Sequence, residues 1–440
     1  MNYSIFKTDY YQFTMSLAYL IAGKANETTG FESFIRHIKK DVNPIDECYI
    51  FSGSEEVYDF IKKVEEEIND ENFFDSFWNI VEKTVREEKK EEFYQIAKDN
   101  FERMDKVFEY TIIPEGSVVK PYVPVFQFKG PKMIGQMIET KITNIVNGQT
   151  GFRSFACYGK NEILSSLADI LFPNERNQTA INEYETKIRD RAIEYRKSTS
   201  KVILEAGYRR APNEEIAIMA SKIAMEEGWN GTSNVAAYTK GYVDINAIGG
   251  TMAHAFIMSF EDEIEAFKIW NDIYPNSTIL VDTYDTIEAV KKLIDYNIKP
   301  STVRIDSGNL KEMSYKVREI LDNANWTDVK IFISGDITPD MLKEFEEESV
   351  PFDITMAGTK YVNIDEMVHV NAGFVYKIVE YEKNGKRYFP IKKATGKSNY
   401  PGLKAVHFNG DISVNIKEDF GFYGNPKSIT KSSKVTFEGF

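Results

Sequence analysis

The second half of the chain alternates short apolar runs with longer segments in which apolar residues recur at helical spacing. The apolar runs predict strands at Thr278–Val281, Thr302–Ile305, Val329–Ile333 and Phe352–Thr355. Helices are predicted between them, two of which run near Leu310–Leu321 and Pro339–Glu348. The strands recur about every 25 residues, which is typical of βα units in a parallel sheet or barrel.

Polar residues and glycines follow each of these predicted strands. The strand ends are Asp282-Thr283, Asp306-Ser307-Gly308, Ser334-Gly335-Asp336 and Ala357-Gly358-Thr359. In a βα barrel the carboxyl ends of the strands form the active-site face, and the loops after the last strands commonly bind phosphate through glycine N–H groups. Turn geometry explains any one glycine equally well. Four polar strand ends on one face are harder to explain by turns alone, so we expect an active site there.

The first part of the chain mixes helical and strand patterns. The apolar stretch at 13–22 resembles the core of a signal peptide, but no basic cluster precedes it and Asp9 lies just upstream. We therefore expect a buried amphipathic helix that starts near Asp9. A strand is expected at Phe31–Ile35, and Ser117–Phe128 is β-rich with prolines that favour edge positions. The charge run at 82–93 favours a solvated helix face.

Composition and charge narrow the functional class. The chain has 440 residues, 42% of them hydrophobic, which suits two or three domains with buried cores. The formal net charge of −14 gives no general attraction for nucleic acid or anionic membranes, so phosphate must be bound by local groups. Cys48 and Cys157 form no Cys-x-x-Cys motif, which argues against zinc or disulfides and favours a cytoplasmic protein. No apolar run has the length of a membrane span.

Nine short motifs, in order along nearly the whole chain, resemble those of the nicotinate phosphoribosyltransferase family. They are Thr8-Asp9-Tyr10-Tyr11-Gln12, Pro114-Glu115-Gly116, Gly207-Tyr208-Arg209-Arg210-Ala211, Gly231-Thr232-Ser233-Asn234-Val235, Gly250-Thr251-Met252-Ala253-His254, Val281-Asp282-Thr283-Tyr284-Asp285, Arg304-Ile305-Asp306-Ser307-Gly308, Ser334-Gly335-Asp336 and Pro401-Gly402-Leu403-Lys404. Each motif is weak alone, whereas nine in the expected order are a specific match.

The resemblance implies a fold and an organisation. The fold is α/β, of the type II phosphoribosyltransferase kind, in which an irregular βα barrel adjoins an α+β domain built from both chain ends. We expect the N-terminal α+β domain at 1–135 and the barrel with the active site at 136–375. The C-terminal segment at 376–440 is expected to pack back on the N-terminal domain.

The resemblance also implies an activity. The family makes nicotinate mononucleotide and diphosphate from nicotinate and phosphoribosyl diphosphate, driven by ATP hydrolysis, and it requires magnesium. For this chain we expect Mg²⁺ to arrive with the substrate rather than in a site built by the protein. The family is usually dimeric, and the aromatic residue of the N-terminal motif reaches the partner's site. A homodimer is therefore expected, with Tyr11 stacking on the pyridine ring.

Three residues are the candidate catalytic groups. In the family the histidine of the Gly-Thr-Met-Ala-His motif accepts a phosphoryl group from ATP, which would make His254 a phosphohistidine. Neutral imidazole is nucleophilic near neutral pH, although a lone histidine is more often structural. Asp282 and Asp306, at neighbouring strand ends, could bind ribose hydroxyls or magnesium, or stabilise positive charge at the anomeric carbon. The alternative for both is capping of the following helices.

The candidate substrate-binding residues are basic, small or aromatic. Arg209 and Arg210 suit bidentate anion binding, and the family places the first arginine near the pyridine ring and the phosphates. Arg304 should point into the barrel, toward Asp306 or a substrate phosphate. The remaining candidates are Tyr11, Thr251 and a proposed 5′-phosphate cradle of Gly335, Asp336, Gly358 and Thr359. In that cradle Asp336 would contact ribose hydroxyls or cap a helix.

The loop that holds Ser233 and Asn234 bears on the choice of base. Related nicotinamide enzymes carry an aspartate in this loop, which would repel a carboxylate, whereas Ser233 and Asn234 are neutral donors compatible with nicotinate. Three positions depart from the family pattern: Ala206 replaces a usual phenylalanine, Asn309 a usual aspartate and Ala357 a common glycine. Asn309 is more typical of amide-using relatives. A nicotinamide phosphoribosyltransferase is therefore the first alternative, and a non-catalytic phosphate-binding barrel is the second.

Overall fold

A six-stranded parallel sheet carries the predicted βα units in the computed structural model, which describes residues 3–43, 48–158, 161–171, 178–390 and 399–438. The strand order is β7 (Gly231–Thr232), β6 (Val202–Glu205), β11 (Ile354–Ala357), β10 (Lys330–Ile333), β9 (Thr302–Ile305) and β8 (Thr278–Leu280). All neighbouring pairs are parallel. Within the described residues the edge strands β7 and β8 do not pair with each other, so the sheet is an open, irregular half-barrel. This confirms the expected α/β barrel-type fold.

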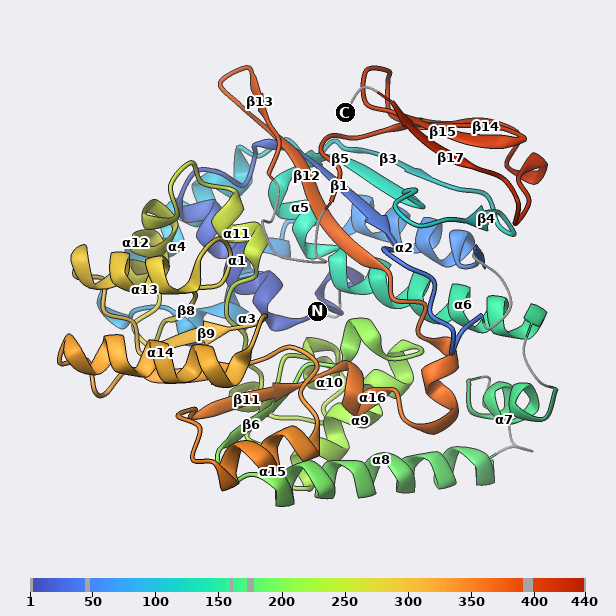
Figure 1. Cartoon of the computed structure of the whole chain (residues 1–440). Helices are drawn as coiled ribbons and strands as arrows, with labels where there is room; N and C mark the ends of the chain where they lie inside the picture. Colours follow the sequence, from blue (N-terminus) through green and yellow to red (C-terminus); the bar gives the residue numbers. More distant parts are fainter. Residues whose placement is uncertain (1–2, 44–47, 159–160, 172–177, 391–398, 439–440) are drawn as a thin grey trace.

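Helices cover this sheet, which is why its strands read as nearly continuous apolar runs. Strand β9 is buried along its whole length. The longer covering helices are α8 (Gln178–Ser198), α9 (Glu214–Glu226), α12 (Glu263–Ile273), α13 (Thr286–Asp295), α14 (Leu310–Asn323) and α15 (Pro339–Glu347). Neighbours along this series pack together, such as α13 with α14 and α15 with α8 (Figure 1). Three short helices, α10 (Val235–Thr239), α11 (His254–Met258) and α16 (Thr359–Val362), follow loops of the sheet.

The last predicted strand is shifted by two residues from its expected place. The sequence predicts Phe352–Thr355, whereas β11 spans Ile354–Ala357. The Asp353 side chain accepts a hydrogen bond from the Ile331 N–H at 2.8 Å, so this acid joins the residues before β11 to β10. Ala357 then pairs with Glu205 at the carboxyl end of β6. The other three strands match their predictions to within one residue at each end.

A second sheet is built from both chain ends, as the resemblance implied. It is antiparallel, with the order β13 (Lys386–Tyr388), β12 (Val375–Lys383), β1 (Thr28–Phe34), β5 (Phe126–Pro131) and β3 (Glu109–Ile112). Beyond it lie a four-stranded sheet and a two-stranded ribbon: β16 (Gly421–Gly424), β14 (Ala405–Asn409), β15 (Asp411–Asn415) and β17 (Val435–Glu438), then β2 (Tyr49–Ile50) and β4 (Val118–Val119). The domain boundaries at 135 and 375 stay predictions.

The proline-based prediction of edge positions is wrong for β5. This strand lies between β1 and β3, in the interior of its sheet. Pro121 and Pro124 precede it, in the turn between β4 and β5, where they break no ladder hydrogen bond. The charge run at 82–93 matches its prediction only in part, because residues 90–93 begin α4 (Lys90–Glu102) and Glu91 and Glu92 are exposed there. It forms two short 3₁₀ turns, Glu82–Thr84 and Glu87–Lys89, before α4 begins, and Val85 and Phe93 are buried.

The first helix, α1 (Tyr10–Ile21), begins just after Asp9 as expected but is buried on nearly all sides rather than amphipathic. It packs against helices of the N-terminal part and against α12. The other helices before α8 are α2 (Ser54–Glu67), α3 (Phe73–Val81), α4 (Lys90–Glu102), α5 (Lys132–Met137), α6 (Glu139–Tyr158) and α7 (Asn161–Leu171). A search of the described residues finds no helix with the length and apolar character to traverse a lipid bilayer.

Candidate functional site

The carboxyl ends of β8, β9 and β10 are tied together by polar side chains. The Ser307 hydroxyl donates to Asp282 Oδ2, and the Ser334 hydroxyl donates to Asp306 Oδ1 at 2.7 Å. Arg304 Nη1 lies 3.9 Å from Asp306 Oδ1. These bonds link each strand end to the next, so the predicted Asp282, Arg304 and Asp306 are brought together on one face.

His254 lies at the same face, as the first residue of α11. Its Nδ1 is 3.0 Å from the Thr283 hydroxyl, and its Nε2 is 3.8 Å from Asp306 Oδ2. Arg304 Nη2 donates to the Met252 carbonyl at 2.7 Å and so holds the turn that leads to the histidine. The structure thus places His254 between two strand ends, with a carboxylate beside one ring nitrogen.

The glycine of the His254 motif has a packing reason. A Cβ on Gly250 would lie 2.5 Å from the Tyr11 amide nitrogen, so the chain crosses the start of α1 at backbone distance. Thr14 donates to the Thr251 carbonyl at 2.8 Å, and the Ala253 N–H donates to Met15 Sδ at 3.3 Å. The Gly250–His254 segment is therefore seated on α1. A contact of Thr251 with substrate stays a prediction.

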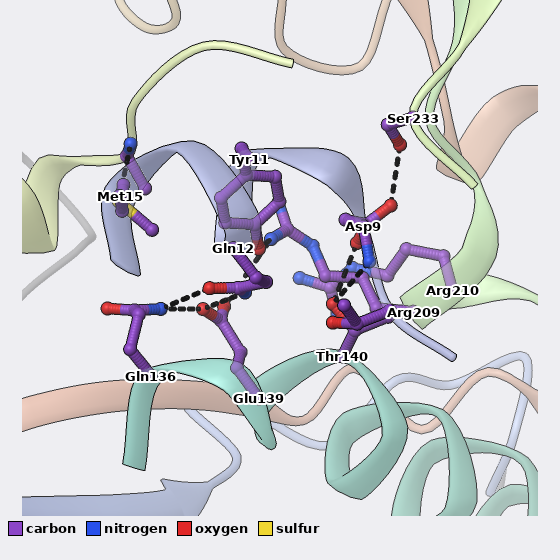
Figure 2. Close-up of polar contacts among 12 residues, drawn as sticks. Asp9, Tyr11, Gln12, Met15, Gln136, Glu139, Thr140, Arg209, Arg210 and Ser233 are labelled. Atoms are coloured by element: carbon purple, nitrogen blue, oxygen red, sulfur yellow. Dashed lines mark hydrogen bonds and ion pairs between the residues drawn. The ribbon is translucent and has the colours of Figure 1, made fainter. Parts of the chain in front are cut away.

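The N-terminal motif and Arg209 meet in the cluster that Figure 2 shows, beside the neighbouring Arg210. Arg209 Nη1 donates to the Tyr11 hydroxyl, and the guanidinium lies 5.4 Å from the centre of the Tyr11 ring. Glu139 Oε1 is 3.4 Å from Arg209, while Glu139 Oε2 accepts from Gln12 and Gln136 at 2.9 Å each. Burial acts to lower the pKa of Arg209, but Tyr11 and Glu139 outweigh it and raise that pKa.

Arg209 and Arg210 point to different neighbours. Arg210 Nη1 donates to the Phe374 carbonyl at 2.7 Å instead of joining the Tyr11 cluster. Burial and the adjacent Arg209 lower the pKa of Arg210 to about 10. Tyr11 contacts Arg209 of its own chain here, and its reach into a partner's site stays a prediction.

Ser233 and Asn234 are both engaged inside the protein. The Ser233 hydroxyl donates to Asp9 Oδ1 at 2.5 Å, and Thr140 donates to Asp9 Oδ2 at 3.0 Å (Figure 2). The Asn234 amide donates to Ser221 at 3.0 Å, and its oxygen caps α10 by accepting from Ala237 at 3.3 Å. The contacts of Ser233 and Asn234 therefore connect the residues after β7 to the start of α1, which gives this motif a structural role. Direct contact of either side chain with a base stays a prediction.

The expected phosphate turns bring strand ends close together. Gly335 has a φ of +103°, and a Cβ there would lie 2.5 Å from the Asp306 carbonyl oxygen. A Cβ on Gly358 would lie 2.6 Å from the Ala206 carbonyl oxygen. Asp336 adopts a left-handed φ of 51°, and Thr359 begins α16. Backbone approach explains both glycines, and the phosphate-cradle role of all four residues stays a prediction.

The structure shows the contacts of the three residues that depart from the family pattern. Asn309 caps α14, because its side chain accepts a hydrogen bond from the Glu312 N–H at 3.2 Å. An aspartate would cap the helix equally well, so the cap does not explain why an asparagine stands here. Ala206 donates its N–H to the Ala357 carbonyl at 2.9 Å and accepts the close approach of Gly358, so the two alanines lie side by side at adjacent strand ends.

Sequence analysis assigned no role of their own to three residues that the structure places in or beside the site. Thr283 contacts His254, and Glu139 contacts Arg209. Glu205 is fully buried and accepts hydrogen bonds from Ser221 at 2.8 Å and from Thr232 at 2.5 Å. Burial raises the pKa of Glu205 to about 7, although these two hydrogen bonds act to lower it. Thr283 and Glu205 stand at strand ends, which was the available signal. Glu139 lies on α6 and gave none.

Comparisons of the sequence with known proteins point to one family. A family model described as nicotinate phosphoribosyltransferase (NAPRTase) N-terminal domain matches residues 6–147. Nicotinate phosphoribosyltransferase of Bacillus subtilis is 27% identical, over 91% of this chain and 72% of that protein. Nicotinate phosphoribosyltransferase pncB2 of Mycobacterium tuberculosis is 26% identical, over 95% of this chain and 78% of its own.

Solved structures have the same fold. The crystal structure of nicotinate phosphoribosyltransferase from Porphyromonas gingivalis superposes with a TM-score of 0.62 at 17% identity, covering 91% of this chain and 96% of that one. A second crystal structure, of a protein from Saccharomyces cerevisiae, gives a TM-score of 0.61 at 16% identity, with 90% and 94% covered. At these identities the likeness shows the fold alone.

Proposed function

The chain belongs to the nicotinate phosphoribosyltransferase family, and we infer that it transfers a phosphoribosyl group to nicotinate with release of diphosphate. The observation that carries this inference is the meeting of His254, Asp282, Arg304 and Asp306 at adjacent strand ends of the half-barrel. Relatives that span nine-tenths of the chain carry the same name throughout. The product, nicotinate mononucleotide, is a precursor of NAD.

Arg209 and Tyr11 are proposed to bind the base. A guanidinium matches the planar carboxylate of nicotinate and binds it in preference to an amide. A neutral donor shows no such preference between a carboxylate and an amide. The Tyr11 ring, already in contact with the guanidinium, would offer one face for the pyridine. Arg209 also has Glu139 nearby, so the incoming carboxylate would share this cation.

The two aspartates are proposed to act on the ribose. Asp306 is the more exposed strand-end carboxylate and lies beside both His254 and Arg304. Asp282 is buried and held by Ser307. As the bond from the anomeric carbon to diphosphate breaks and the pyridine nitrogen attacks, positive charge develops on the sugar. Carboxylates fixed near that carbon would stabilise it.

We further propose that His254 couples the transfer to ATP. A ring nitrogen would attack the γ-phosphorus, form an N–P bond and expel ADP, and water would later cleave that bond to give phosphate. The carboxylate of Asp306 beside Nε2 favours a proton there, which leaves the lone pair on Nδ1 beside Thr283. Asp306 would also offset the positive charge that develops on the ring.

Magnesium is proposed to enter with the substrate. In the described part of the chain, no group of three or more His, Cys, Asp or Glu side chains is placed to hold a metal ion. Mg²⁺ bound to the diphosphate would offset the negative charge of that leaving group. The homodimer, which the resemblance suggests, and the cytoplasmic location, which the cysteine content suggests, remain proposals.

A competition assay tests the choice of base. Purified protein is given phosphoribosyl diphosphate, ATP and Mg²⁺ with equal nicotinate and nicotinamide, and both mononucleotides are quantified. We expect kcat/KM for nicotinate to exceed that for nicotinamide by about a hundredfold or more, because an unpaired Arg209 is costly when the ligand lacks a carboxylate. Preferential use of the amide would overturn the assignment, and no use of either base would favour a non-catalytic barrel.

A further inference from the structure

Two cations from distant parts of the chain donate hydrogen bonds to the same short backbone segment. Lys39 Nζ donates to the Asn371 carbonyl at 2.9 Å, and Arg210 Nη1 donates to the Phe374 carbonyl at 2.7 Å. Between them lies Gly373, with a φ of +86°, where a Cβ would lie 2.7 Å from Lys39 Cε. The lysine stem therefore rests directly on the segment 371–374, which leads into β12.

Asn147 fixes this segment independently of the cations. Its side-chain oxygen accepts from the Gly373 N–H at 2.8 Å and from the Phe374 N–H at 2.6 Å. Its amide donates to the Arg209 carbonyl at 3.2 Å, which ties the segment to the arginine turn. Asn147 thus bonds the N–H groups of this segment, whereas the two cations bond its carbonyl groups.

Neither cation has an acidic partner within ion-pair distance in the described ranges of the chain. Each is half-buried and is instead bonded to a carbonyl oxygen. Burial and the nearby Arg210 lower the pKa of Lys39 to about 8, and burial with Arg209 lowers that of Arg210 to about 10. No carboxylate of these ranges contacts either cation directly, although Asp41 and Asp336 act on Lys39, and Asp336 and Glu139 on Arg210, from a longer distance.

The cluster adjoins the turns expected to bind phosphate. The charges of Asp336 and Lys360 both reach Lys39, and Asp336 also acts on Arg210. Asp336 follows Gly335 at the end of β10, and Lys360 follows Gly358 and Thr359 at the end of β11. Lys39, from the N-terminal part, therefore brings a third cation to the edge of the half-barrel beside Arg210 and Lys360.

We propose that Lys39 and Arg210 bind a phosphate group of the phosphoribosyl substrate, a role that rests on the proposed function. An ammonium and a guanidinium each carry several N–H donors, and the described contacts of each cation include a single hydrogen bond. Both can keep their carbonyl bond and still donate to phosphate oxygens. The bound phosphate would place negative charge in direct contact with both cations.

Calorimetry on the full-length protein tests this proposal with two probes. Ribose 5-phosphate reports on the 5′-phosphate, and inorganic diphosphate reports on the leaving group. We expect Lys39→Met to weaken binding of one or both by about tenfold, the loss of one charge-assisted hydrogen bond. Lys39→Arg, which keeps the charge, should retain binding within about threefold. The probe that loses affinity identifies the phosphate that the cations hold.

Lys40→Met is the matched control, because Lys40 is the adjacent, exposed lysine of the same segment. It should leave the affinity for both probes unchanged. Unchanged affinity for both probes in a folded Lys39→Met protein would overturn the proposal, and so would an equal loss in Lys40→Met. If Lys39→Met fails to fold, Lys39→Gln and the salt dependence of wild-type binding replace it. The role would also be refuted if neither added salt nor Lys39→Gln changed the affinity for the two probes.

Binding and turnover fail separately. Loss of probe binding in Lys39→Met by a protein that makes no nicotinate mononucleotide would uphold the phosphate site and reject the proposed activity. Normal turnover with unaltered KM for phosphoribosyl diphosphate in Lys39→Met would uphold the activity and reject the phosphate site. In the expected case KM for that substrate rises about tenfold, whereas kcat changes less than twofold.

Discussion

His254 is oriented by both of its ring nitrogens. Thr283 lies beside Nδ1, and Asp306 lies beside Nε2, each from the end of a different strand. The Arg304 bond to the Met252 carbonyl fixes the turn before it. A histidine held in this way has a set direction, which nucleophilic attack on a phosphoryl group requires.

Replacing His254 by alanine should separate the two halves of the reaction. We expect nicotinate-dependent ATP hydrolysis and acid-labile labelling from γ-labelled ATP to disappear. Some uncoupled phosphoribosyl transfer should persist, because Arg209, Asp282 and Asp306 are untouched. ADP release and protein-bound label measure the effect. His407→Ala is the control, since His407 pairs with Glu418 on the C-terminal sheet, and an unchanged ATPase in His254→Ala would end the phosphohistidine proposal.

At this scale the sequence identified residues better than it identified their partners. The motif match selected Arg209 and Tyr11, but their mutual contact, across 198 positions, came from the fold. Ser233 and Asn234 were expected to face the base, and both are engaged by Asp9, Ser221 and Ala237. Which polar groups are satisfied internally depends on long-range packing, so residue types alone could not reveal it.

Among the elements, the start of α9 is an electrostatic joint between three parts of the chain. Glu214, in its first turn, pairs with Lys7 at 2.9 Å and with Lys141 at 3.0 Å, and it accepts from Tyr208 at 2.9 Å. Burial alone would raise the pKa of Glu214, but the two lysines outweigh it and lower that pKa to about 2. The joint therefore depends on an ionised carboxylate.

The pH dependence of stability should expose this joint. A folded-state pKa near 2, below the usual 4.5, makes the ionised form stabilising above pH 4.5, and this stabilisation is lost as the pH falls toward 2. Relative to Glu214→Gln, the wild type should gain about 3 kcal/mol above pH 4.5 and nothing near pH 2. Urea unfolding across this range measures the difference. Glu55→Gln, at the exposed first turn of α2, should show no such pH dependence, and a pH-independent Glu214→Gln difference would contradict the account.

The strands of the half-barrel were predictable, whereas sheet order was not. Buried parallel strands leave compact apolar runs between helices, so β8, β9 and β10 could be located from sequence to within a residue. The short β7 has two residues and leaves almost no pattern. The pairing of β1 with β12 joins residues about 350 positions apart, and no local signal specifies it.

For the whole molecule, a buried ion pair joins the two chain ends. Lys404 Nζ lies 2.6 Å from Glu32 Oε2, and both side chains are almost wholly inaccessible to solvent. Lys404 also donates to the Tyr400 and Gly402 carbonyls, and its own N–H donates to Gln127 at 2.7 Å. The Pro401–Lys404 motif thus closes the C-terminal segment onto β1 and β5.

Breaking this pair should loosen the union of the chain ends. Lys404→Met leaves the Glu32 carboxylate buried without a cation, which costs about 3–5 kcal/mol of unfolding free energy. Adding Glu32→Met should recover part of the loss, because the remaining charge is then removed. Equilibrium denaturation of the single and double variants measures both. A loss below about 1 kcal/mol in Lys404→Met would show that the pair does not stabilise this junction.

The most direct measurement is the stoichiometry of the reaction itself. Purified protein is incubated with nicotinate, phosphoribosyl diphosphate, ATP and Mg²⁺, and nicotinate mononucleotide and diphosphate are quantified together. The account predicts equal amounts of the two products, both dependent on nicotinate and both sharply reduced in Arg209→Met. Absence of nicotinate mononucleotide under these conditions, from a folded protein that binds the substrates, would contradict the assigned activity.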